Sequence, residues 1–122
     1  MKYLCLVYLD EQRLDALPDN DCVDYDEEIR KSGHCIASEA LQSVHTATTV
    51  RVRNGKVSVT DGPFAETKEQ LAGFYLIEAK DLNDAIRIAA KIPPAHVGSI
   101  EIRPVRPIRE TVAKDKASRP GG

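Results

Sequence analysis

Residues 61–77 read DGPFAETKEQLAGFYLI, and this stretch decides the fold of the chain. The tetrapeptide DGPF is turn-forming, because an Asp before Gly-Pro commonly bonds backbone N–H groups. A short charged segment follows it and leads into an apolar run, Leu71 to Ala79. A strand with one solvated face should alternate between apolar and polar residues, and this run does not alternate. The run therefore predicts a strand that is buried on both faces.

A second run of the same kind opens the chain. Residues 3–9 are apolar at every position, which predicts another strand buried on both faces. The segment has no charged leader and no small-residue cleavage site, so we interpret it as a strand and not as a signal peptide. These two runs are expected to form the centre of the sheet.

Periodicity, turn residues and helix-terminating residues predict the other elements. In chain order we expect a loop at 10–17, a helix at 19–32, a strand at 34–41, a hairpin with arms at 48–53 and 56–60, a helix that begins at Asp81 and ends before Pro93-Pro94, and a half-exposed strand at 98–103. Asp84 stands three residues after Asp81, which is the spacing of a weak capping box.

The hairpin is marked by Asn54-Gly55, the pair that supplies two positive φ angles to a type I′ turn. Both arms alternate, with valines on one face and charged or hydroxyl side chains on the other. We expect the valine face to be packed and the other face to be solvated.

The order strand, helix, strand, hairpin, strand, helix, strand predicts an α+β fold. It corresponds to a ferredoxin-like βαβ(ββ)βαβ arrangement with an antiparallel sheet. Both helices cover one side of such a sheet, so the other side of the central strands would expose apolar residues to water. A second copy placed face to face would cover them, which predicts a homodimer. The alternative is a monomer in which the hairpin or the C-terminal segment folds back over that side.

Length and composition narrow the class of protein. The 122 residues fit one domain, which we place at 1–106, followed by a mobile charged tail at 107–122. A net charge of −2 argues against nucleic-acid binding, and no apolar run approaches the roughly 20 residues of a membrane helix. Three cysteines and three histidines show no metal-ligand spacing, and unpaired cysteines are typical of a reduced, cytoplasmic protein.

Residues 60–75 (TDGPFAETKEQLAGFY) resemble the signature of DGPF-domain proteins in the YCII-related family. Supporting matches are EALQ at 39–42, ATTVR at 47–51 and GSIEIRPV at 98–105. The resemblance implies a dimeric α+β barrel built from ferredoxin-like protomers. Most such proteins have no established activity. The wider superfamily includes small-molecule isomerases, lactone-acting enzymes and oxygenases, and some DGPF proteins resemble accessory partners of extracytoplasmic-function sigma factors.

YCII relatives are proposed to use a His and an Asp as an acid–base pair, and Asp61 matches the motif Asp. The His expected near the first helix has no counterpart in residues 19–32, and His34 is the nearest substitute. Glu39 is a third candidate for catalysis, because a carboxylate in a strand of small apolar residues either pairs with Arg51 or Arg53 or serves as a base of raised pKa. Asp61 also has a purely structural interpretation as a turn former.

Four further residues are candidates for ligand binding: Tyr8, Tyr75, Glu66 and Lys68. The two tyrosines lie on the central strands and could line a cleft against the dimer mate, or simply pack in the core. Phe64 is expected in the core or in the dimer contact. Glu66 and Lys68 belong to the charged segment after the turn, either as the rim of a cleft or as a solvated turn.

Three hypotheses follow. The first is a small-molecule enzyme that works without metal or other cofactor, by acid–base chemistry in a cleft at the dimer. The second is a non-enzymatic ligand-binding or regulatory dimer with a protein partner such as a sigma factor. The third is a structural dimer without a pocket.

Overall fold

A computed structural model of the chain describes residues 1–16 and 19–109. The side chains of residues 14–22, Cys22 among them, lie outside the description, as do the residues 110–122 that contain most of the predicted tail. The strands are β1 (Lys2–Leu9), β2 (Cys35–Ala40), β3 (Thr48–Arg53), β4 (Lys56–Asp61), β5 (Gln70–Glu78) and β6 (Ser99–Pro104), and the α-helices are α1 (Asp19–Lys31) and α2 (Leu82–Ala89).

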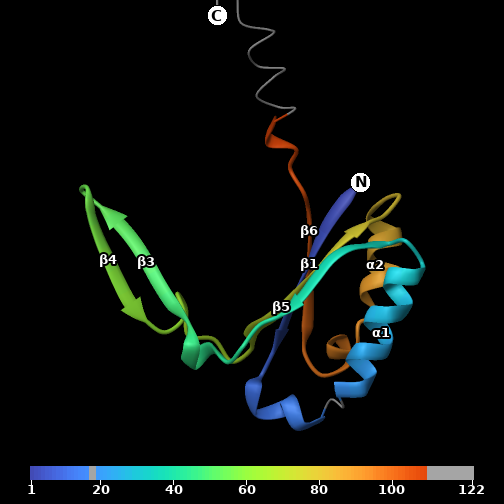
Figure 1. The fold of residues 1–122 in the computed structure, drawn as a ribbon, viewed down its shortest axis with the longest axis horizontal. Helices are drawn as coiled ribbons and strands as arrows, with labels where there is room; N and C mark the ends of the chain where they lie inside the picture. The colour runs from blue at the N-terminus through green and yellow to red at the C-terminus, as the bar shows by residue number, and fades with distance from the viewer. Residues whose placement is uncertain (17–18, 110–122) are drawn as a thin grey trace, which may run out of the picture.

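Four strands form one antiparallel sheet in the order β2-β5-β1-β6. Both helices lie on the same side of this sheet, and the β3–β4 hairpin stands apart from it (Figure 1). This is the ferredoxin-like α+β fold predicted from the sequence. The two apolar runs occupy the two central strands, β1 and β5, as expected.

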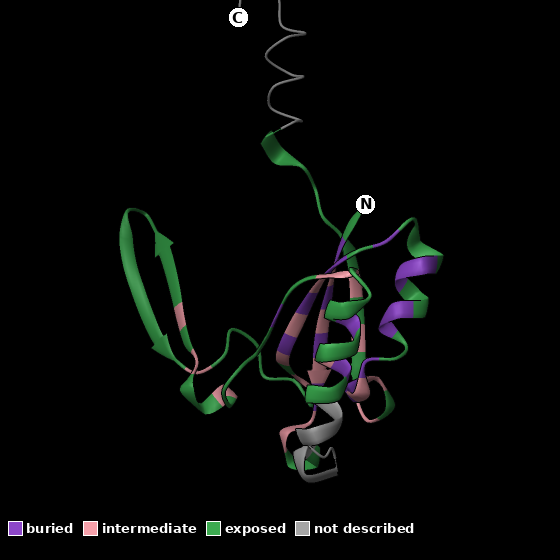
Figure 2. Cartoon of the chain, turned by 45° about the vertical axis from the view of Figure 1, so that its right-hand side comes forward, coloured by how far each residue is buried: buried purple, intermediate pink, exposed green. Residues whose placement is uncertain are grey.

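Only one face of the central strands is buried within the protomer. On β1, Tyr3, Cys5, Val7 and Leu9 are 0–4% exposed and belong to the core under the helices. The residues between them, such as Leu4 and Leu6, are only partly buried, so burial alternates along the sheet strands (Figure 2). The prediction of burial on both faces is therefore met on one face only. We call the uncovered side of the four-stranded sheet the open face.

The helices reach the core through short apolar stripes. α1 contributes Tyr25 and Ile29, and α2 contributes Ala85, Ile88 and Ala89. The start of α2 is capped as predicted, since the Asp81 carboxylate accepts from the backbone N–H of Asp84 at 2.8 Å. The Asp84 carboxylate reaches back to the N–H of Lys80, one residue before the capping residue.

The predicted loop at 10–17 is wrong, because Glu11–Ala16 form a 3₁₀ helix. Asp10 starts it by accepting from the Gln12 N–H through its side chain and from the Arg13 N–H through its carbonyl. An acidic residue ahead of a short run of good helix formers favours such a turn. Val44–Thr46 and Pro93–His96 form two further 3₁₀ helices.

The hairpin forms with the predicted register. Val50 pairs with Val59 and Val52 with Val57, and the turn uses positive φ angles at Asn54 and Gly55. The expectation of one packed face is not met within the protomer, because the four valines are 55–67% exposed. The hairpin does not fold back over the open face either (Figure 1), so it does not supply the cover that a monomer would need.

Among the described helices, none has the length and apolar character needed to cross a bilayer. The boundary of the domain at residue 106 and the mobility of the tail after it stay predictions, since residues 110–122 are outside the description.

Candidate functional site

The segment that joins the hairpin to β5, residues 62–69, forms the wall of three neighbouring cavities. Its first residue, Gly62, has a φ of 105°, which favours glycine. The Gly62 N–H donates to the carbonyl of Ala47 at 2.8 Å, and the Thr49 hydroxyl donates to the carbonyl of Gly62 at 2.9 Å. No described residue donates a hydrogen bond to the Asp61 carboxylate, so the backbone of Gly62, and not the Asp61 side chain, holds this turn.

The first cavity has a volume of about 610 Å³ and lies beside the open face. Tyr8 and Leu71 of the sheet form its floor, and Phe64 forms part of its wall. Its other walls come from residues 41–44, 46, 47, 63, 65, 67 and 70. None of the described side chains that line it carries a full charge at neutral pH, so the cavity suits a ligand with an apolar body. We call it the apolar cavity.

Glu11 holds the outer wall of the apolar cavity in place. Its carboxylate accepts from the Ser43 hydroxyl at 2.9 Å and from the Val44 N–H at 2.7 Å. The Glu11 N–H donates to the side-chain carbonyl of Gln70 at 3.4 Å. Sequence reasoning missed this role, because the partners lie more than 30 residues away along the chain.

The second cavity, of about 500 Å³, brings titratable side chains together. It is lined by Asp61, Glu66 and His45, and it shares Thr67 and Gln70 with the apolar cavity. Asp61 and Glu66 were predicted as site residues. His45 is a site residue that sequence reasoning missed. The sequence feature that could have indicated His45 is Ser43, a residue that commonly caps a helix start. The Ser43 hydroxyl accepts from the His45 N–H at 3.2 Å and caps the 3₁₀ helix that contains His45. We call this the polar cavity.

A third cavity, of about 730 Å³, is lined by Thr67, Lys68 and Glu69 of the same segment. Lys68 and Arg13 face it together with several carboxylates, and the Glu69 carboxylate accepts from the Ser99 hydroxyl at 2.7 Å. Tyr8 lines both this cavity and the apolar cavity. The predicted ligand-binding residues Tyr8 and Lys68 are therefore close to one another, with Tyr8 at the junction.

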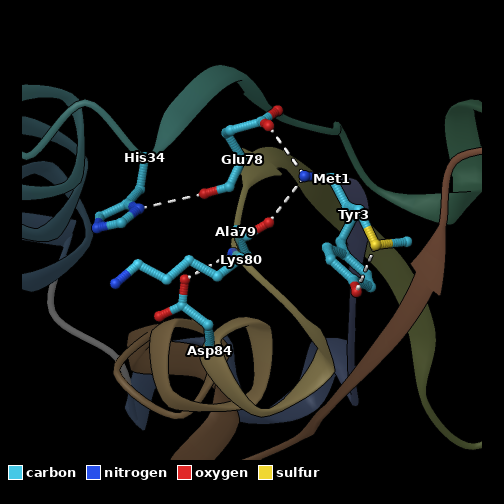
Figure 3. Close-up of polar contacts among 7 residues, drawn as sticks. All are labelled: Met1, Tyr3, His34, Glu78, Ala79, Lys80 and Asp84. Atoms are coloured by element: carbon cyan, nitrogen blue, oxygen red, sulfur yellow. Dashed lines mark hydrogen bonds and ion pairs between the residues drawn. The ribbon is translucent and has the colours of Figure 1, made fainter.

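His34 is placed at a different part of the molecule. Its Nδ1 lies 3.1 Å from the carbonyl oxygen of Glu78 at the end of β5 (Figure 3). It lines a cavity of about 220 Å³ between the helices, together with Tyr25, Asp84 and Arg87. His34 and Asp61 thus line separate cavities, and the structure does not bring these two predicted catalytic residues together.

Asp84, which lines the same cavity as His34, is a hydrogen-bonded carboxylate. It is 7% exposed, accepts from the Lys80 N–H at 2.9 Å and forms an ion pair with Arg87. The Lys80 N–H first, and then the Arg87 guanidinium, hold the pKa of Asp84 below its usual value. Both oxygens of the Asp84 carboxylate therefore have partners near the start of α2, and we assign this group a structural role there.

Glu39 lies on the open face of the edge strand β2, opposite Phe74, and its residue is exposed. Its predicted ion pair with the hairpin is absent between described residues. Arg51 lies over the Phe64 ring, 5.2 Å from the centroid, and Arg53 donates to the carbonyl of its neighbour Val52. Glu39 lines neither the apolar nor the polar cavity.

The positions of Tyr75 and Phe64 decide whether each residue packs in the core of the protomer, as the sequence allowed. Tyr75 is buried on the helix-covered side, with its ring 5.6 Å from that of Tyr25 in an edge-to-face contact. It packs in the core and does not face the open side of the sheet. Phe64 is 76% exposed, so it is not part of the core of the protomer.

The buried thiol Cys5 is also a core residue. Cys5 and Cys35 are both free, and burial raises the pKa of Cys5 to about 11. A thiol with a raised pKa is a poor nucleophile at neutral pH. Within the described residues, no group of three or more His, Cys, Asp or Glu side chains is arranged to hold a metal ion.

Residues 1–109 match the family model of the YCII-related domain, so the chain belongs to the YCII-related family. This agrees with the resemblance carried by residues 60–75. Among curated proteins, an uncharacterized protein of Rhizobium meliloti is 49% identical over 61 residues, which cover 48% of this chain. The match spans 49% of that protein's length, so the chain aligns with about half of the relative.

Proposed function

We propose that this YCII-related chain binds a small, largely apolar molecule in the apolar cavity and performs acid–base chemistry on it without a cofactor. The observation that carries the proposal is the shared wall of the two cavities, which contains Thr67 and Gln70. The volume of about 610 Å³ lies within the roughly 300–1,000 Å³ of small-molecule sites. A molecule held there would present one end to the polar cavity.

His45 and Asp61 are the proposed acid–base residues. A histidine changes charge near neutral pH, which suits it to accept and return a proton. A carboxylate on the same cavity can orient the imidazole and stabilise its protonated form. Tyr8, at the junction of the apolar cavity with its neighbour, is the proposed hydrogen-bonding contact for a ligand oxygen.

The proposal includes a homodimer. The open face places partly exposed apolar side chains, including Leu4, Leu6, Phe74 and Leu76, next to one another across β1 and β5. A second sheet packed face to face would remove them from water, and a two-fold axis makes the same surface complementary to itself. The apolar cavity would then lie at the edge of the dimer contact.

A second candidate is a ligand-binding protein without chemistry, in which the ligand controls a protein partner. It is favoured by the lining of the apolar cavity, which contains no carboxylate, imidazole, amine or guanidinium group among the described residues. Both candidates require binding, and only the first requires His45 and Asp61.

Binding is tested with a thermal-shift screen of uncharged aromatic alcohols, ketones and lactones. A compound present at about 100 times its Kd adds roughly 2.7 kcal/mol to stability and should raise Tm. The variant Ala65→Trp places a large side chain where the two cavities meet and should abolish the Tm shift. Asn83→Trp, which introduces the same side chain on the exposed side of α2, should leave it intact. If no compound raises Tm in the wild type, the proposal fails.

Chemistry is tested on the compounds that bind. Exchange of their C–H protons for deuterium in D₂O reports proton abstraction directly by NMR. The wild type should accelerate exchange, and His45→Gln and Asp61→Asn should each slow it by roughly 10²–10⁴-fold while the thermal shift is retained. Binding without exchange would support the second candidate.

A further inference from the structure

The hairpin carries an apolar surface that the described residues of its own protomer leave uncovered. Val50, Val52, Val57 and Val59 form two adjacent cross-strand pairs on one face of β3–β4, which we call the valine face. Each of them is more than half exposed. A two-stranded hairpin alone in water is marginally stable at best, and β-branched cross-strand pairs contribute most when they are covered. Among the described residues, the valine face therefore has no packing partner.

The base of the hairpin is held firmly while its far end extends away from the body. Thr49 and Ala47 both bond to Gly62, which fixes the exit of the hairpin beside the start of residues 63–69. Arg51, on the opposite face from the valines, lies over the Phe64 ring. The hairpin leaves an open angle between itself and the open face (Figure 1).

Charge and apolar surface both point to a second copy of this chain as the occupant. Residues 48–61 carry three cations and one anion, so the rest of the chain carries a net charge of −4 against −2 for the whole. The opposite net charges of the hairpin and the rest of the chain favour the approach of two copies, whereas the contact itself is apolar, because the three cations lie on the face opposite the valines. The same chain also offers the uncovered open face, so two copies related by a two-fold axis can cover both apolar surfaces at once.

We propose that the β3–β4 hairpin is a dimerisation arm, whose valine face packs against a second copy seated on the open face. The dimerisation arm rests on the homodimer included in the proposed function, and it names the hairpin as the element that stabilises that homodimer. Face-to-face sheets alone would leave the valine face in water, whereas a reciprocal pair of arms buries it twice.

The test replaces all four valines by threonine, which keeps side-chain size and strand propensity but removes the apolar surface. Sedimentation velocity on the wild type should give a mass twice that of the 13.4 kDa chain. In the threonine variant the dissociation constant should rise by about tenfold or more, each tenfold corresponding to about 1.4 kcal/mol. Ser58→Ala with Thr60→Ser, on the opposite face, should leave the dissociation constant unchanged.

A weaker dimer in the threonine variant could also result from unfolding of the hairpin, so hydrogen exchange in the wild type provides a second test. In the wild type, protection of the β3 and β4 amides should rise with protein concentration across the dimerisation range, because docking adds to the stability of the arm. Protection that is independent of concentration would overturn the proposal. A threonine variant that dimerises as tightly as the wild type would overturn the arm but leave a sheet-mediated dimer. A wild-type monomer would overturn both. The thermal-shift screen reports ligand binding separately from all these outcomes.

Discussion

Val7 and Val57 are the same side chain in the same kind of secondary structure, yet one is 4% exposed and the other 67%. Val7 lies on β1 under two helices, and Val57 lies on a hairpin that none of the described helices covers. Their local patterns indicate strands in both cases. The difference shows that a strand pattern reports which residues share a face, and that the neighbouring layer decides whether the face is buried.

The open face of the sheet is intermediate between these two regions. Leu6 and Phe74 are opposite one another on adjacent central strands and shield each other in part. They have lateral neighbours but no covering layer, so they are partly buried where the hairpin valines are exposed. Within residues 1–16 and 19–109 there is therefore one completed interface, with the helices, and there are two apolar surfaces that we assign to a second copy.

The largest expected effect on the free energy of unfolding comes from truncating a side chain on the helix-covered face of the sheet. Ile77 is fully buried, so Ile77→Ala should lower the free energy of unfolding by about 2–5 kcal/mol. Val57→Ala in dilute protein should change it by less than about 0.5 kcal/mol, because the side chain is exposed in the protomer. Urea unfolding at micromolar and at submillimolar protein measures both.

Protein concentration separates the two sites further. The cost of Ile77→Ala should not depend on concentration, since its partners belong to the same chain. The cost of Val57→Ala should grow with concentration if the hairpin docks on a second copy. Equal costs for the two variants in dilute protein would contradict the contrast drawn between the two strands.

An intermediate effect is expected from two glycines, one in each region. A Cβ added at Gly98 would lie 2.1 Å from the carbonyl oxygen of Tyr8, so Gly98→Ala should cost about 1–3 kcal/mol and shift the backbone beside Tyr8. Gly55, at the hairpin turn, has open space around it but a φ of +75°. Gly55→Ala should cost about 1–2 kcal/mol as local strain.

Amide chemical shifts distinguish the two glycine variants. Gly98→Ala should perturb residues on β1 and around the apolar cavity, and Gly55→Ala should perturb only the hairpin. Perturbations of equal extent would mean that the hairpin is coupled to the body more tightly than its position suggests.

The smallest expected effect is the pH dependence of stability that comes from Asp84 in α2. The pKa of Asp84 is lowered in the folded state, so its stabilising contribution is complete above the ordinary Asp pKa of about 3.9 and is lost as pH falls through the lower folded-state value. Asp84→Asn should therefore lose less stability than the wild type between pH 5 and pH 2. The urea midpoint against pH measures this, and parallel curves for the two proteins would contradict it.

Much of the fold could be predicted because its signals are local. Asn54-Gly55 requires positive φ, Asp81 caps the helix that follows it, and continuous apolarity marked β1 and β5 as central. Each of these depends on neighbours within a few residues. The 3₁₀ helix at Glu11–Ala16 was missed because its start depends on a single acidic residue and its apolar pattern is weak.

The site was harder to predict, because it depends on contacts between distant segments. The sequence alone determined that Asp61 and Glu66 lie on one segment, and that Tyr8 lies on a central strand. Only the tertiary structure decided that His45, and not His34, lines a cavity with Asp61, and that Tyr75 faces the helices. It likewise decided that the hairpin valines are uncovered. The physical reason is that periodicity fixes which side chains share a face, whereas sheet register and helix packing fix what that face meets.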